Sequence, residues 1–363
     1  MTGQNQKLSS NHAADADTSA ERIYAHALTA KGLDPDIAAE VARRTRRSCH
    51  VTGDAVAREP SVVRPPRHKR RADAALLESA AEIGSTTPGA CDIAYQHTIM
   101  CQIGLPRSKA AVDGLTVFER RCGDAVLRVT AGALFDGERL VQQPIPYGAY
   151  PRLILAWLNT RAVITRSPVI EVGDSAAAFL RVLGKSCTGG ANGSLTHFRR
   201  HMQALAACHL TLGLNAAGRA YTYTGQPVQQ FLAWVASKTE HQRSLWPGVV
   251  TFGGDYYRSL IEHAVPQDVR AMYALKGSAL AMDVYGMLAE RLHRVTGRPV
   301  TLTWAMLRGQ FGQEYRGRHP DKDFRAAFLA ALKSVLAVYP TAKVEQVRGG
   351  LRLHASPPPI AYR

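Results

Sequence analysis

Arginine and glutamine side chains are grouped between Ser194 and Ala207 in a pattern that suits contact with DNA. One set of apolar residues recurs at helical spacing and predicts the buried face of a helix, namely Leu195, Phe198, Met202 and Leu205. The opposite face would carry Thr196, Arg199, Arg200 and Gln203. Arginine forks fit guanine edges and phosphates, and a glutamine amide fits adenine. We therefore predict a helix that reads DNA, with a solvated surface helix as the alternative.

A second basic group lies nearer the C-terminus and consists of Arg318, Lys322, Arg325, Lys333 and Arg348. Lys322, Arg325 and Lys333 fall on the outer face of an expected helix. Its inner face would hold Phe324, Ala327, Phe328, Ala331 and Val335. Arg348 begins the expected turn Arg348-Gly349-Gly350, where glycines supply the positive φ of a tight hairpin. A basic residue there either lies against the minor groove or a phosphate, or is an ordinary exposed arginine.

Three motifs could indicate catalysis instead, and each lacks a required partner. Gly184-Lys185-Ser186 resembles the end of a phosphate-binding loop, but Phe179 stands where that motif needs its first glycine. His197 and His201 have the spacing of a helical metal pair, but the two arginines between them would repel a cation. We expect phosphate contact or plain surface there. No histidine or acidic cluster accompanies Tyr256-Tyr257, so one of the two is expected in the core. We predict no catalytic residue and no enzyme.

The cysteines do not indicate a metal site. They lie far apart and form no CxxC pair: Cys49, Cys91, Cys101, Cys122, Cys187 and Cys208. In a chain of 363 residues this pattern is typical of reduced thiols. We therefore expect no metal and no cofactor.

The elements that would position the two basic groups occur twice in the same order. A short strand, two helices and a hairpin are expected over residues 167–224 and again over residues 298–355. In the first helix, matched residues of the two units are 128 positions apart in the sequence. The second helix is matched after a shift of two residues. The matched pairs are Val172 with Val300, Ser175 with Thr303, Phe179 with Leu307, Leu183 with Phe311, Phe198 with Phe324, and Met202 with Phe328. This is the outline of a winged helix, whose second helix enters the major groove.

Each expected unit ends in a hairpin. The first would pair Leu210–Leu214 with Tyr221–Thr224, and the second Val344–Val347 with Leu351–Leu353. Residues 94–146 alternate as strands do and are expected to pack against the first unit.

We therefore predict an α+β fold with two tandem winged-helix domains related by internal duplication. Residues 1–88 would form a basic, partly disordered N-terminal region. Residues 89–246 would hold the first winged-helix domain and its preceding β-rich segment, residues 247–357 the second, and residues 358–363 a tail. Arg58–Arg71 has few apolar residues and cannot bury enough surface to fold alone. It would be a flexible arm, either a DNA tether or a solvated linker.

The bulk composition agrees with a polyanionic partner. The net charge is +16 and the isoelectric point about 9.8. No apolar run reaches the roughly 18 residues of a transmembrane helix. The N-terminal residues contain no apolar secretory region. We expect a cytoplasmic protein without a membrane partner.

A linked run of motifs resembles RepA-type plasmid replication initiators, the family that shares a RepA C-terminal region. The motifs extend over roughly residues 94–357 and are Leu105-Pro106-Arg107, Tyr147-Gly148, Pro151-Arg152-Leu153, Ala156-Trp157-Leu158, Asp174-Ser175, Phe179-Leu180, Leu183-Gly184, Thr188-Gly189-Gly190, Gly193, Gln203, Leu205, Lys276, Asp283-Val284-Tyr285, Trp304, Leu307, Gln310-Phe311-Gly312 and Phe324. The first 75 residues show no match, and the resemblance assigns no DNA contact to a particular residue.

The resemblance implies a bacterial initiator that binds repeated sites, called iterons, in the double-stranded DNA of a plasmid origin. It would promote opening of the duplex and loading of the host replicative helicase, contact the host initiator protein, and repress its own promoter. Plasmid copy control and a homodimer are further expectations. A transcriptional regulator alone and an origin-nicking rolling-circle enzyme are the alternatives.

Overall fold

The computed structural model describes residues 68–123, 125–135, 138–172, 176–183, 187–190, 193–216, 219–231 and 249–361. These residues belong to one compact unit, which runs from Pro66 to Arg363. Most of the expected arm Arg58–Arg71 lies outside the described residues. No described helix is both long enough and apolar enough to cross a bilayer.

The first described element is a helix inside the N-terminal region that we expected to be partly disordered. Helix α3 (His68–Ser85) packs against α9 (Val269–Ala274) and α12 (Pro320–Val338). Its residues Leu76, Ala80 and Ile83 lie against the hydrophobic core. The helix is ordered because one side is apolar, a signal that the neighbouring basic residues obscured in the sequence.

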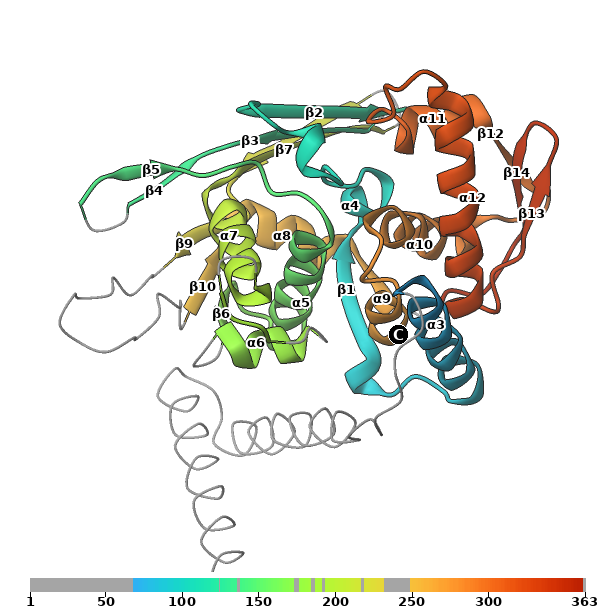
Figure 1. The fold of residues 1–363 in the computed structure, drawn as a ribbon, viewed down its shortest axis with the longest axis horizontal. Coiled ribbons are helices and arrows are strands. Elements are labelled where there is room, and N and C mark those ends of the chain that lie inside the picture. The colour runs from blue at the N-terminus through green and yellow to red at the C-terminus, as the bar shows by residue number, and fades with distance from the viewer. Residues whose placement is uncertain are drawn as a thin grey trace, which may run out of the picture. The chain divides into compact units, whose positions relative to one another are not determined.

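A short antiparallel pair follows and joins distant parts of the chain. Strand β1 (Ile93–His97) pairs with β11 (Ala264–Asp268), with Ile93 opposite Asp268. The short 3-10 helices η1 (Ala90–Asp92) and η2 (Lys109–Ala111) and the helix α4 (Thr98–Gln102) flank this strand. Strands β4 (Ala133–Phe135) and β5 (Leu140–Gln142) form a separate hairpin, visible in Figure 1.

We call the next group of elements the first lobe. It contains α5 (Ala149–Thr165), β6 (Val169–Glu171), α6 (Ala176–Val182), α7 (Ser194–Ala207), β9 (Val228–Phe231) and β10 (Val249–Phe252). Its strands form an antiparallel sheet in the order β6-β10-β9. Strand β10 lies beyond the domain boundary that we expected at residue 246, yet it pairs with β6 of this lobe. Helix α8 (Gly254–Glu262) then leads to β11.

The expected first hairpin exists but belongs to another sheet. Strands β7 (His209–Ala216) and β8 (Arg219–Gly225) pair with each other, and β7 also pairs with β3 (Ala125–Thr130). With β2 (Val117–Cys122) they form a sheet in the order β2-β3-β7-β8. The residues 94–146 therefore contribute strands to the hairpin's own sheet, and β9 with β10 occupies the place that we assigned to the hairpin. Local alternation predicted the strands, but their partners depend on contacts distant in sequence.

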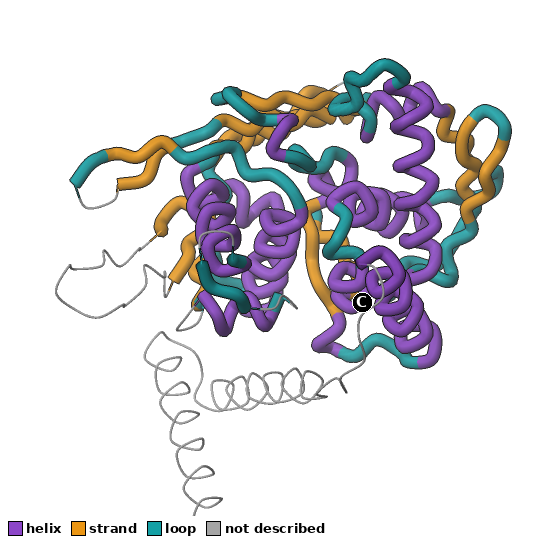
Figure 2. Tube along the Cα trace, in the orientation of Figure 1, coloured by secondary structure: helices purple, strands orange, loops and turns teal. Residues whose placement is uncertain are grey.

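We call the C-terminal group of elements the second lobe. It contains α10 (Ala279–Arg291), β12 (Val300–Thr303), α11 (Trp304–Phe311), α12, β13 (Val344–Val347) and β14 (Gly350–Leu353). The 3-10 helix η3 (Leu292–Arg294) extends α10. The strands form an antiparallel sheet in the order β12-β14-β13, which confirms the predicted hairpin. Its turn is shorter than predicted, because Gly350 already belongs to β14 and lies opposite Val347. Figure 2 shows the helices of both lobes with their strands around them.

Aromatic side chains form the centre of each lobe. In the first lobe, the rings of Phe179 and Phe198 lie 5.4 Å apart between centroids. In the second lobe, Phe324 and Phe328 lie 5.5 Å apart. Both members of four matched pairs are buried: Phe179 and Leu307, Leu183 and Phe311, Phe198 and Phe324, and Met202 and Phe328. In the other two pairs Val300 is partly exposed, Thr303 is exposed, and Ser175 lies outside the described residues.

Candidate nucleic-acid interface

Helix α7 presents the first predicted set of DNA-binding residues. Phe198, Met202 and Leu205 are buried, which confirms the predicted inner face. On the opposite side Arg199 and Arg200 are exposed, and Thr196 and Gln203 are partly exposed. The arginines are therefore available to a polyanion, because the apolar side of the helix is committed to the core.

The start of α7 is held by a short loop whose residues bond to one another. We predicted Ser194 as the cap, but the cap residue is Gly193, and Ser194 is the first helical residue. The hydroxyl of Ser194 accepts from the backbone N–H of Thr188 at 2.8 Å, and the Ser194 N–H donates to the Thr188 hydroxyl at 2.9 Å. The hydroxyl of Thr196 donates to the carbonyl of Gly190 at 2.8 Å. Thr196 therefore fixes the loop to the helix, in addition to its predicted place on the outer face.

His201 is a core residue and not a surface ligand. It is buried, stacks on Tyr150 with centroids 5.5 Å apart, and meets the ring of Tyr147 edge-on at 4.8 Å. Burial lowers the pKa of His201 to about 4, and the nearby charges of His197 and Arg200 act in the same direction. Neither predicted role, phosphate contact or plain surface, applies to His201, because its position on α7 turns it toward α5.

Helix α12 presents the second predicted set. Lys322, Arg325 and Lys333 are exposed, whereas Phe324, Phe328 and Val335 on the inner side are buried. The guanidinium of Arg325 lies 4.7 Å from the centre of the Trp304 ring. This cation–π contact with the first residue of α11 helps to hold the guanidinium in place. Trp304 was not among the predicted site residues.

The remaining predicted residues lie in loops beside α12. Arg318 is exposed just before the helix, and Arg348 is exposed in the two-residue turn between β13 and β14. The connection between α11 and α12 is pinned by Arg308, which donates to Asp321 at 2.9 Å and to the carbonyl of Tyr315 at 2.8 Å. Figure 1 shows α7 and α12 apart, on either side of α4 and α10 in that view. The two predicted sets therefore form two separate faces.

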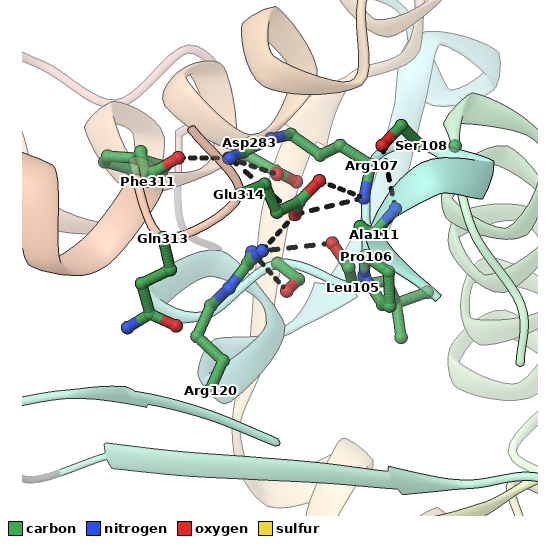
Figure 3. A network of polar contacts seen from close by, with 12 residues as sticks. Leu105, Pro106, Arg107, Ser108, Ala111, Arg120, Asp283, Phe311, Gln313 and Glu314 are labelled. Atoms are coloured by element: carbon green, nitrogen blue, oxygen red, sulfur yellow. Dashed lines mark hydrogen bonds and ion pairs between the residues drawn. The ribbon is translucent and has the colours of Figure 1, made fainter. Parts of the chain in front are cut away.

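A buried ionic network connects the two lobes (Figure 3). Arg152 of α5 donates to Asp283 of α10 through Nε at 2.6 Å and through Nη2 at 2.8 Å. Arg120 of β2 donates to Glu314, which follows α11, and to the carbonyl of Gly104 at 2.8 Å. The backbone N–H of Arg107 donates to both oxygens of Glu314 at 3.3 Å. All five side chains are at most 11% exposed, so each charge depends on its protein partners.

Sequence reasoning assigned no role to Arg120 or Glu314, although one signal was present. Phe118 and Arg120 are two residues apart on a strand, so they point to the same face, and that face is the core. Arg120 is fully buried, and burial lowers its pKa to about 10, with the charge of Arg107 as the second cause. Its partner is 194 residues away, which no local pattern reveals.

The structure places part of the motifs that we considered for catalysis. Among them, no group of three or more His, Cys, Asp or Glu side chains could hold a metal ion. Tyr256 is buried, and its hydroxyl donates to Oδ1 of Asn159 at 3.0 Å, which confirms that one tyrosine of the doublet packs in the core. Gly184-Lys185-Ser186 lies outside the described residues.

Comparisons with known proteins agree with the motifs read from the sequence. The family model described as plasmid-encoded RepA protein matches residues 145–306, which confirms the resemblance to RepA-type plasmid replication initiators over that segment. The segment includes the first lobe and α10, and it ends within α11. The family supports plasmid replication initiation as the process in which the protein acts.

Two solved structures are also similar. One holds selenomethionine derivatives of domain 2 and domain 3 of RctB, with 11% identity and a TM-score of 0.41, covering 71% of this chain and 98% of that chain. The other holds RctB domains 2–3, with 11% identity and a TM-score of 0.41, covering 70% and 94%. No curated protein matches the chain.

Proposed function

We propose that this protein initiates plasmid replication by binding iterons in the double-stranded DNA of the origin. Two winged-helix lobes would grip the DNA without cutting it. The match to plasmid-encoded RepA proteins supports the process, and the exposed basic residues of α7 and α12 support the mode of binding. Opening of the origin, loading of the host helicase, contact with the host initiator and repression of its own promoter belong to the same proposal.

The topology of the two lobes supports the winged-helix assignment. Each lobe runs helix, strand, helix, helix, and then two further strands, and each sheet places its last strand in the middle. In winged-helix proteins the second helix of the helix-turn-helix enters the major groove. That helix is α7 in the first lobe and α12 in the second. The duplication inferred from the sequence is part of this proposal.

One observation carries the proposal: the two helices place basic residues at corresponding positions. Helix α7 begins at Ser194 and α12 begins at Pro320, so Arg199 and Arg325 are each the sixth residue of their helix. Both are exposed. N-terminal residues of a recognition helix are the ones that contact base edges. A solvated surface helix would not require an arginine at the same position in both lobes.

The proposed roles follow from position. Arg199, Arg200 and Gln203 would read one half of the site, and Thr196 would support them. Arg318, Lys322 and Arg325 would contact the other half, and Lys333 and Arg348 would contact phosphates. A good bidentate base contact is worth about 1–3 kcal/mol of discrimination. If roughly 6–10 phosphates are neutralised, the affinity falls about 10³–10⁵-fold between 50 and 200 mM salt.

The test is an electrophoretic mobility shift with duplex DNA from the origin region. Arg200→Ala and Arg325→Ala should each weaken binding and reduce the preference for origin DNA over a scrambled duplex. Arg258→Ala is the matched control, because Arg258 is exposed on α8 and pairs with Asp255 at 3.4 Å. Unchanged affinity and specificity in both α7 and α12 variants would refute the assignment of the reading helices.

Two further assays separate the alternatives. Supercoiled origin plasmid incubated with magnesium or manganese should stay supercoiled, whereas a relaxed product with a protein-linked 5′ end would indicate a nicking enzyme. The gene with its flanking repeats should sustain a plasmid that lacks another origin. Binding without such replication would indicate a regulator alone.

A further inference from the structure

We propose that the carboxylate of Glu314 is a positioning group that fixes the distance between α7 and α12. It would thereby set the spacing of the two half-sites that the protein accepts. This inference rests on the proposed function, because it assumes that both helices contact one DNA site. Glu314 itself contacts no DNA in this proposal.

A continuous mechanical path runs from one reading helix to the other through Glu314. Helix α7 ends at Ala207, and β7 begins at His209. Strand β7 is hydrogen-bonded to β3, and β3 is hydrogen-bonded to β2, which carries Arg120. A displacement of α7 is therefore coupled through these three strands to Arg120. Arg120 donates to Glu314. Six residues later Pro320 begins α12, so the path ends at the second reading helix.

Glu314 accepts hydrogen bonds from Arg107 and Arg120, which lie outside both lobes, and the guanidinium of Arg107 also donates to the carbonyl of Phe311 at the end of α11. Its oxygens accept from the Arg107 N–H, and the Arg107 guanidinium lies 3.7 Å away. The other carboxylate of the network, Asp283, is bonded to Arg152. Figure 3 shows Glu314 between Arg107 and Arg120. The connection from Gly312 to His319 has no regular helix or strand, so a fixed carboxylate within it restrains the direction of α12.

Two neutral contacts flank this carboxylate. The side chain of Gln310 donates to the carbonyl of Gln102 at 2.6 Å. The side chain of Gln313 donates to the carbonyl of Arg121 at 3.0 Å and to that of Gly309 at 2.7 Å. These bonds seat the end of α11 on β2 and α4. The charged contact is central because Arg120 is fully buried and needs an anion, which makes the pairing hard to exchange for water.

The first experiment measures the distance between the helices in the full chain without DNA. Spin labels are attached through Arg199→Cys on α7 and Ala330→Cys on α12, after the native cysteines are replaced by serine. Double electron–electron resonance should give a narrow distance distribution. Glu314→Gln should broaden it, whereas Glu262→Gln, an exposed change on α8, should leave it narrow. A distribution in Glu314→Gln as narrow as in the parent would overturn the proposal.

A second variant covers the case in which Glu314→Gln does not fold. Gln313→Ala removes the contact with β2 and leaves every buried charge paired. This variant should also broaden the distribution of spin-label distances, but less than Glu314→Gln does. If Glu314→Gln is unfolded and Gln313→Ala leaves the distribution unchanged, the proposal fails.

The second experiment uses the origin site that the parent protein protects in footprinting. The probes are the intact duplex, duplexes with either half scrambled, and duplexes with 5 or 10 base pairs inserted between the halves. Five inserted pairs rotate the halves by about half a turn. The parent should lose its advantage for the intact site with that insertion. In Glu314→Gln the ratio of the affinity for the intact site to the affinity for a half-site should fall about tenfold. When the two helices are less rigidly linked, binding of the first gives the second a lower effective concentration at its half-site.

Half-site affinity separates positioning from general damage. It should be the same in the parent and in Glu314→Gln, since each reading face is intact. An equal loss on half-sites and intact sites would show a merely structural role and would contradict the proposal. If the parent protects no site at all, the proposed function fails, while the spin-label distances still decide whether Glu314 positions the helices.

Discussion

The two lobes share a strand order but differ in what lies between their last helix, α7 or α12, and their last two strands. In the second lobe α12 leads to β13 and β14, which are joined by the turn at Arg348 and Gly349. In the first lobe the hairpin β7–β8 is inserted between α7 and β9. That hairpin pairs with β3 and extends a sheet outside the lobe.

The difference lies in how each lobe is joined to the rest of the protein. In the second lobe the hairpin β13–β14 has a short exposed turn, and both of its strands belong to the lobe's own sheet. In the first lobe the inserted hairpin β7–β8 pairs with β3 and so belongs to the sheet that carries Arg120. In our proposal this sheet, through Arg120, helps to position the second lobe.

The largest expected effect tests whether the lobes unfold as one body. Phe198 and Phe328 are both fully buried, one in each lobe. Phe198→Ala and Phe328→Ala should each cost about 3–5 kcal/mol of unfolding free energy, since each leaves a cavity. Chemical denaturation followed by near-ultraviolet circular dichroism should show one transition that moves in both variants. Two transitions, with only one moved by each change, would mean that the lobes are independent.

The next effect concerns acid, and it should originate in the first lobe. The pKa of His201 is about 4 in the folded protein and 6.5 when exposed, because burial disfavours the charged form. Protons therefore bind the unfolded chain first, so this stability is present above pH 6.5 and is lost as the pH falls toward 4. The loss amounts to about 3 kcal/mol at the acid end.

His201→Leu removes this titration and should flatten the dependence of stability on pH between 7 and 4. His97, whose pKa burial also lowers to about 4, stays in the variant, so a smaller slope persists. Denaturation midpoints measured across this range provide the comparison. Equal slopes in the parent and the variant would contradict the assignment.

A smaller effect concerns the capping of the helix starts. Thr303 caps α11 by accepting from the N–H of Met306 at 3.2 Å, whereas α7 has Gly193 at its cap and no side-chain acceptor. Thr303→Ala should destabilise the protein by about 1 kcal/mol. Thr303→Ser keeps the hydroxyl and should cost less. Thermal unfolding checks both, and equal loss would show that the hydroxyl bond does not matter.

The smallest expected effect concerns phosphate contact. Lys333→Ala should weaken binding to origin and scrambled duplexes alike, and should reduce the slope of affinity against salt by about one. Lys109→Ala, an exposed change outside both lobes, is the control. A changed preference between the two duplexes would instead place Lys333 at a base edge.

Patterns within one element were enough to predict much of this fold. The alternation of apolar and basic residues in α7 and α12 predicted which sides are buried. The glycines after Arg348 predicted the turn, and the alignment of Phe198 with Phe324 predicted two buried aromatic positions. These predictions hold because helix period, strand period and positive φ are properties of short segments.

Patterns that involve partners far along the chain were not readable. The strands β7 and β8 were predicted, but their neighbour β3 was not, because a strand of alternating residues can pair with any similar edge. His201 looked like a surface ligand because charged neighbours flank it, and only the packing of Tyr147 and Tyr150 shows that it is buried.

By itself the sequence determined the basic character of the chain, the two cationic helices and the short hairpin of the second lobe, since each depends on residues a few positions apart. Only the tertiary structure decided that β10 completes the first lobe, that α3 packs against the core, and that Arg120 meets Glu314. The last of these pairs joins residues 194 positions apart in the sequence. The energy of these contacts comes from burial and charge neutralisation, which exist only after the chain has folded.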